Sequence, residues 1–151
     1  MTAKHILVPT DFSAYADHAL AYAIELATAL RARLTLLHVF HLSPLTVGEV
    51  PPAVLNTVLQ EIETDAQKQT QIALDRIQQA GLQGDSAIVE GLPFQTIIDA
   101  AKDKDIDLIV MGTHGRTGLT HVLMGSVAEK VVRLAPCPVL VTRGTTEAAG
   151  A

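Results

Sequence analysis

The chain is poor in the features that mark secreted, membrane-bound and nucleic-acid-binding proteins. Its 151 residues include one cysteine, Cys137, which excludes an internal disulfide framework and fits a reducing compartment. No apolar run approaches the roughly 20 residues that a membrane helix needs. The 11 basic and 16 acidic side chains give a net charge of −5, the wrong sign for a general binder of DNA or RNA. We therefore expect a cytoplasmic protein without nucleic-acid or membrane partners.

What the chain has is aliphatic content and regular alternation. Hydrophobic residues make up 48% and charged residues 18%, which predicts a compact globular fold, and the length suits one domain. Short apolar runs predict five strands, at residues 5–9, 33–40, 85–91, 107–112 and 138–142. Helical spacing predicts four helices between them, at residues 13–33, 52–80, 93–105 and 126–136.

This βαβαβαβαβ order predicts a single-domain, doubly wound α/β fold. Its five-stranded parallel sheet would carry helices on both faces, with a ligand crevice at the carboxyl ends of the strands where chain order reverses. The first helix has Ser13 as its expected N-cap. Residues 41–52 have turn chemistry and are a candidate mobile flap, and residues 144–151 are expected to be a disordered tail after a domain of residues 1–143.

The stretch MGTHGRTGLTHVLMGS, residues 111–126, carries the functional signal. It follows the fourth predicted strand and leads into the last helix, with Ser126 as the natural N-cap. The free N–H groups and the dipole of a helix start attract phosphate. Glycines at 112, 115 and 125 can adopt positive φ and let the main chain approach a ligand. The alternative is that these glycines only make a tight loop.

The spacing of these glycines resembles the ATP-binding signature of the universal stress protein family, G-x2-G-x9-G-[ST]. Here the match is Gly112, Gly115 and Gly125-Ser126. The segments ILVPTDFS, LLHV, DLIVMGTHGRTGL and MGSVAEKVVRLAPCPVLV also look like that family, so the resemblance covers nearly the whole chain. It implies a Rossmann-like fold of the adenine nucleotide alpha hydrolase type that binds ATP, or else ADP or AMP.

The resemblance also implies roles on the nucleoside side of the ligand. Asp11 would hold the ribose, and its alternative role is to cap the first helix. Pro9 and Thr10 would line the adenine side. Val39 would offer main-chain hydrogen bonds to the adenine edge, although a valine in such a strand is buried whatever the function.

On the phosphate side the resemblance implies a set of mostly main-chain contacts. Met111 and Gly112 would contact ribose and α-phosphate, Gly115 the β- and γ-phosphates, and Gly125, Ser126 and Val127 would donate from the helix start. Arg116 and His114 are candidates for added charge near the terminal phosphates, although a solvated loop residue is the commoner fate. Mg²⁺ would be carried by the phosphates, without direct side-chain ligation.

Other functions of this fold lack their motifs. G-x-G-x-x-G is absent after the first strand, and Gly125-Ser126 has no lysine between them as a P-loop would. The histidines lack metal-ligand spacing, and we identify no nucleophile or catalytic residue. The resemblance implies an ATP-binding protein that acts as a nucleotide-dependent sensor or regulator of stress responses, with an unknown regulatory protein partner. The family also implies a homodimer through Val139, Leu140 and Val141. The alternatives are a dimeric interaction module without functional nucleotide and a slow ATP hydrolase.

Overall fold

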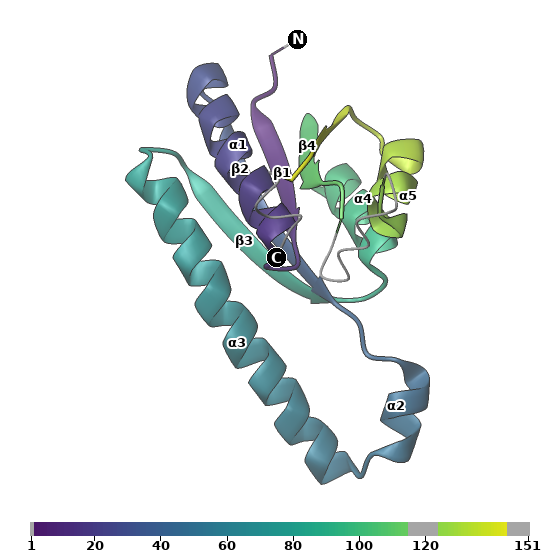
Figure 1. Ribbon diagram of the computed structural model, residues 1–151. Helices are drawn as coiled ribbons and strands as arrows, with labels where there is room; N and C mark the ends of the chain where they lie inside the picture. The colour runs from purple at the N-terminus through teal and green to yellow at the C-terminus, as the bar shows by residue number, and fades with distance from the viewer. Residues whose placement is uncertain (1, 115–123, 145–151) are drawn as a thin grey trace.

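Five parallel strands form one sheet at the centre of the molecule (Figure 1). The computed structural model describes residues 2–114 and 124–144. The strands are β1 (His5–Thr10), β2 (Arg33–Phe40), β3 (Gly84–Glu90), β4 (Leu108–Gly112) and β5 (Val139–Thr142). The helices are α1 (Ala14–Leu30), α2 (Pro44–Glu49), α3 (Pro52–Gln79), α4 (Pro93–Asp103) and α5 (Ser126–Leu134). The doubly wound parallel fold expected from the sequence is confirmed.

In the strand order β3-β2-β1-β4-β5, successive strands are added in one direction from β1 to β3 and in the opposite direction from β4 to β5. The point where this order reverses lies between β1 and β4. From β1 the chain winds outward through β2 to β3, and then returns to β4 and winds outward to β5. In such sheets the loops after the two central strands diverge and leave a crevice at their carboxyl ends. The sheet therefore places the candidate ligand crevice beside the ends of β1 and β4.

Alternating side chains of the strands divide the core into two layers. Ile6 and Val8 of β1 point into a cluster with α1 and α3, whereas Leu7 points into a cluster with α4 and α5. In the first cluster α1 contributes a row of alanines, Ala19, Ala23 and Ala27, each fully buried. Small side chains at helical spacing let α1 approach the sheet closely.

The first helix begins as the sequence predicts. Ser13 is its N-cap, and the Ser13 hydroxyl accepts a hydrogen bond from the N–H of Ala16 at 3.2 Å. The last helix differs slightly from expectation, since Gly125 rather than Ser126 is the N-cap residue of α5. Ser126 already has helical conformation and is the first residue of that helix.

The segment at 41–52, expected to be irregular, contains the short helix α2. In the following helix, Ala66, Thr70, Ala73 and Ile77 are buried against the sheet. None of residues 52–65 is buried, although Leu55, Val58, Leu59 and Ile62 continue the same apolar spacing. Figure 1 shows this half of α3 extending past the ends of the strands toward α2. We call α2 together with residues 52–65 the arm.

Three expectations stay untested. The tail, apart from residue 144, lies outside the described residues, and so do Gly115, Arg116, Gly118 and His121 of the glycine loop. The domain boundary at 143 stays a prediction. Among the helices that the structure describes, none is long and apolar enough to span a membrane.

Candidate functional site

A cavity of about 330 Å³ lies at the carboxyl ends of β1, β2 and β4, beside the start of α5. Every predicted site residue within the described part of the chain lines it: Pro9, Thr10, Asp11, Val39, Met111, Gly112, His114, Gly125, Ser126 and Val127. Gly115 and Arg116 lie outside the described residues. The volume falls at the lower end of the range for small-molecule sites, roughly 300–1,000 Å³.

The wall of the cavity also contains residues that the sequence did not single out. Leu37 and Ile97 are buried and give it an apolar side, with Pro93 at the start of α4 beside them. Leu37 lies two positions before Val39 in β2, so strand periodicity alone places both on one face. Pro93 begins the helix after β3, at the same edge of the sheet as the other loops. The positions of Leu37 and Pro93 could thus be predicted from the sequence. Their role in the cavity wall could not, because core residues and cavity residues have the same apolar chemistry.

Asp11 takes part in the turn between β1 and α1 as well as in the cavity wall. Its Oδ1 accepts a hydrogen bond from the N–H of Ser13 at 3.0 Å, but the residue that caps α1 is Ser13 and not Asp11. The adjacent Phe12 has φ of 62°, a left-handed conformation, and its N–H donates to Thr10 Oγ1 at 3.0 Å.

The start of α5 provides backbone donors at the cavity. Its N-cap is Gly125, which has no side chain to accept from the N–H groups of the first turn. The N–H of Gly125 itself donates to the carbonyl of Thr113 at 2.6 Å, and its predicted role as a donor to the ligand stays a prediction. Ser126 and Val127, the other two predicted donors, both line the cavity.

The glycines at 112 and 125 do not have the backbone conformation that the sequence suggested. Gly125 has φ of −68°, and Gly81 is the one glycine with positive φ among the described residues. At Gly112 the requirement is space, since an added Cβ would lie 3.0 Å from the carbonyl oxygen of Tyr15 in α1. Glycine at 112 therefore permits the close approach of α1 to the end of β4.

His114 lies beside the same helix. Its ring centroid is 5.3 Å from that of Tyr15, at 48°, and its Nδ1 lies 3.0 Å from Thr113 Oγ1. Tyr15 is buried, so it gives the imidazole a fixed surface to pack against. Asp11 and His114 are the two ionisable residues in the described lining of the cavity.

A second polar cluster lies at the opposite, amino-terminal edge of the sheet. His5 Nε2 lies 2.7 Å from Thr35 Oγ1, Thr35 donates to Asp85, and Arg33 reaches His5 Nδ1 at 3.1 Å. Because the carboxylate of Asp85 only accepts, Thr35 must accept from Nε2–H, and Nδ1 then accepts from Arg33. Burial, and next the charge of Arg33, lower the pKa of His5. Nothing in this cluster borders the cavity.

Two further pKa shifts have structural causes. Hydrogen bonds from the N–H groups of Lys4 and His5 lower the pKa of Asp107. Burial raises the pKa of the Cys137 thiol, which packs at the edge of the α4/α5 cluster. The thiol is thus held in its neutral form, as expected for a small hydrophobic residue.

Comparison with known proteins decides the family. A profile of the universal stress protein family matches residues 2–143. The chain belongs to the universal stress protein family. Universal stress protein MJ0531 of Methanocaldococcus jannaschii is 34% identical over 140 residues, which cover 93% of this chain and 82% of that protein. A solved structure of MJ0577 from the same organism superposes with a TM-score of 0.86 at 31% identity, over 97% of this chain and 99% of that one.

Other solved universal stress proteins share the fold. UspA from Lactobacillus plantarum has a TM-score of 0.81 at 32% identity, over 95% of this chain and 99% of that one. More distant structures include a complex with cAMP (TM-score 0.73, 23% identity) and an Archaeoglobus fulgidus protein with dAMP (0.67, 24%). A further structure, from Arabidopsis thaliana, has AMP bound (0.71, 17%). At these identities the likeness shows the shared fold.

Proposed function

We propose that this universal stress protein binds ATP with Mg²⁺ in the cavity and acts in the cytoplasm as a nucleotide-dependent sensor or regulator of stress responses. The observation that carries the proposal is the composition of the cavity wall. One wall is apolar, one is the start of α5, and Asp11 lies at the end of β1 between the loops. An adenine ring, a ribose and a phosphate chain need these three surfaces in turn.

Each surface has its own task in this proposal. Leu37, Val39 and Ile97 would pack against the adenine, and Asp11 would accept hydrogen bonds from the ribose hydroxyls. The N–H groups of Ser126 and Val127 would meet the phosphates at the positive end of the α5 dipole. The bound cAMP, dAMP and AMP of three proteins with this fold support an adenine nucleotide as the ligand.

The donor set also bears on the metal. In residues 2–114 and 124–144, no three histidine, cysteine, aspartate or glutamate side chains gather as a metal site. Mg²⁺ would arrive on the phosphates, where it would neutralise their charge, while Asp11 and the backbone donors would orient the nucleotide. We assign no catalytic residue.

The homodimer belongs to the same proposal. β5 is an edge strand of the sheet, and Val139, Leu140 and Val141 are only half-buried in the single chain. An apolar edge strand offers unpaired backbone groups, which pairing with a second copy would satisfy.

Thermal unfolding with and without Mg·ATP, ADP and AMP tests the site. A nucleotide at 100 times its dissociation constant stabilises by about 2.7 kcal/mol, which raises Tm by roughly 5 to 10 °C. The decisive variant is Ser126→Pro, because proline is favoured at the first position of a helix and removes the backbone N–H together with the hydroxyl. We expect it to weaken ATP binding about tenfold or more, since a hydrogen bond to a charged group contributes roughly 1.5–3 kcal/mol.

Ser126→Ala is the matched control, because it keeps the N–H and removes only the hydroxyl. If Ser126→Pro binds ATP as tightly as Ser126→Ala, the phosphates do not lie at the start of α5. If no nucleotide at millimolar concentration changes the Tm of the unaltered protein, the sensor proposal fails. The dimeric interaction module is then the better account of this chain.

A further inference from the structure

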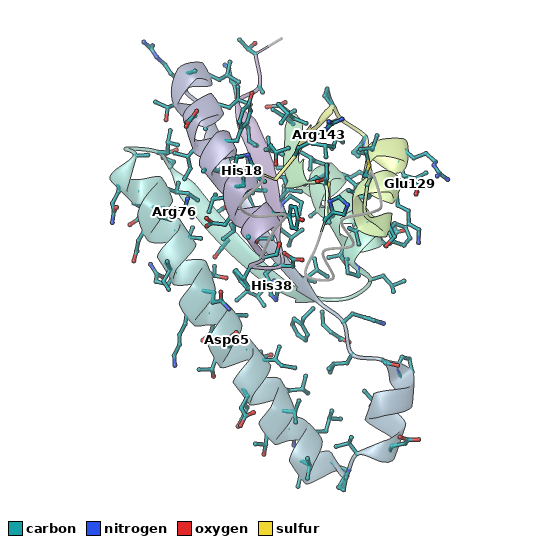
Figure 2. All side chains as sticks on the ribbon, viewed as in Figure 1. His18, His38, Asp65, Arg76, Glu129 and Arg143 are labelled. Atoms are coloured by element: carbon teal, nitrogen blue, oxygen red, sulfur yellow. The ribbon has the colours of Figure 1, made fainter. Side chains whose placement is uncertain are left out.

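The arm exposes apolar side chains that the fold itself does not cover. Val54 is 51% exposed, Val58 38% and Val47 of α2 37%. Figure 2 labels Asp65 near the point where α3 leaves the sheet, and beyond it no other element overlaps the helix until the turn to α2. Fourteen residues of helix, roughly 21 Å at 1.5 Å per residue, thus extend beyond the core.

The apolar residues of the arm lie along one side of the helix. Successive residues of an α-helix are about 100° apart, so Leu55, Val58, Leu59 and Ile62 fall within an arc of about 100°. This stripe continues the row of Ala66, Ala73 and Ile77 that packs on the sheet. Val58 is exposed and Leu55, Leu59 and Ile62 are half-buried, so about two turns of α3 have a core-like stripe that the fold covers only in part.

Acidic residues flank the stripe on both sides. Around the helix, Glu61 and Asp65 lie on one side of it and Glu63 on the other. Asp65 also accepts a hydrogen bond from Gln69, one turn later, at 3.1 Å. The only acidic residues between positions 34 and 67 of the sequence are Glu49, Glu61, Glu63 and Asp65. The same stretch contains none of the 11 lysine and arginine residues of the chain. The arm is thus amphipathic and uniformly negative.

We propose that the arm is a docking surface for a basic amphipathic helix of a partner protein. A helix that pairs with the arm would bury the stripe under its own apolar side chains, and its flanking lysines or arginines would face Glu61, Glu63 and Asp65. Flanking charges select the partner of paired helices in this way. The site is separate from the nucleotide cavity and does not depend on the function proposed for it.

The negative charge of the arm argues against three other binding partners: a second copy of the arm, a membrane surface and the end of this chain. A second copy of the arm would bring the same acids face to face, which is unfavourable. An anionic membrane surface repels an acidic helix, whereas membrane-surface helices are rich in lysine and arginine. The last residues of this chain, 145–151, carry no lysine or arginine that would complement the arm.

The test uses the full chain and a labelled peptide of about 18 residues, built of leucine and lysine so that leucines lie on one helical face. Two control peptides have the same leucine positions with glutamate for lysine, or the same composition in scrambled order. Fluorescence anisotropy at low salt should show binding of the basic amphipathic peptide at least about tenfold tighter than either control. Raising the salt concentration should weaken it, since exposed charges are screened.

Variants locate the binding on the arm. V54N/V58N should weaken it about tenfold or more, whereas I72N, on the same helix outside the arm and 64% exposed, should leave it unchanged. E61Q/E63Q should weaken it at low salt, and E25Q/D103N, which removes two exposed acids elsewhere, should not. Circular dichroism checks that each variant is folded.

Three results would overturn the proposal. One is equal binding of the basic and glutamate peptides, and another is equal loss in V54N/V58N and I72N. The third comes from sedimentation of the protein alone, where self-association abolished by V54N/V58N would make a second copy the occupant of the arm.

Discussion

Replacing Gly112 by alanine tests the contact that the structure places under the cavity. The new Cβ would lie 3.0 Å from the carbonyl oxygen and 3.1 Å from the carbonyl carbon of Tyr15. Both are backbone atoms of α1, which the Ser13 cap and its buried alanines hold in place, so no flexible side chain can give way. Overpacking of this kind costs about 1–3 kcal/mol. At roughly 2–4 °C per kcal/mol for a chain of this size, Tm should fall by about 2–12 °C.

Urea unfolding followed by circular dichroism, without nucleotide, measures this effect on the fold alone. Gly48→Ala is the control, because a Cβ at Gly48 in α2 would meet no atom within 4 Å. We expect its free energy of unfolding to stay the same or to rise by up to about 1 kcal/mol, since alanine is favoured over glycine in a helix. If Gly112→Ala is as stable as the Gly48 variant, α1 does not approach β4 as described, and the reason for glycine at 112 must lie in the ligand.

Three further predictions concern stability and need no ligand. Because the fold lowers the pKa of His5, the unfolded chain binds more protons below about pH 6.5, so the free energy of unfolding should fall between pH 7.5 and 5.5. That fall should be smaller in His5→Gln, and an unchanged pH dependence in urea titrations would contradict the neutral role of His5. Thr70 Oγ1 is buried without a hydrogen-bond partner among the described residues, so Thr70→Val should stabilise by about 1 kcal/mol; a loss of stability would reveal a partner for the hydroxyl. Arg76 pairs with Asp17 between α3 and α1 at an exposed position, so Arg76→Gln should cost less than about 1 kcal/mol by thermal unfolding, and a larger cost would mean that the pair is shielded from water.

The sheet could be predicted from the sequence because its central strands β1 and β4 are apolar on both faces and all five strands alternate with helices. The point along α3 where the hydrophobic core ends could not be predicted from the sequence. Leu55 and Ile62 have the same helical spacing as Ala73 and Ile77, and only the length of the neighbouring strands decides which of them are buried. Periodicity describes one helix at a time, so it predicts a buried stripe wherever apolar residues recur.

The candidate site shows the same limit. The positions of Asp11 and Ser126 in the cavity wall were predictable because Asp11 follows a strand and Ser126 begins a helix at the carboxyl edge of the sheet. The reason for Gly112 was not, since it depends on Tyr15, which is distant in sequence and lies on a different helix. The cluster of His5, Thr35 and Asp85 likewise needs three strands in register, which local patterns do not specify.

The two layers of the core have a mechanical consequence. The arm is one end of a continuous helix whose other end is anchored in the α1/α3 layer, whereas the cavity lies in the α4/α5 layer. Adjacent residues of β2 connect them, since Leu36 points into the first layer and Leu37 lines the cavity. If binding to the arm displaced β2, the displacement would also move Leu37 in the cavity wall and so couple the two sites. Any such coupling is reciprocal, so the nucleotide would change partner affinity by the same factor.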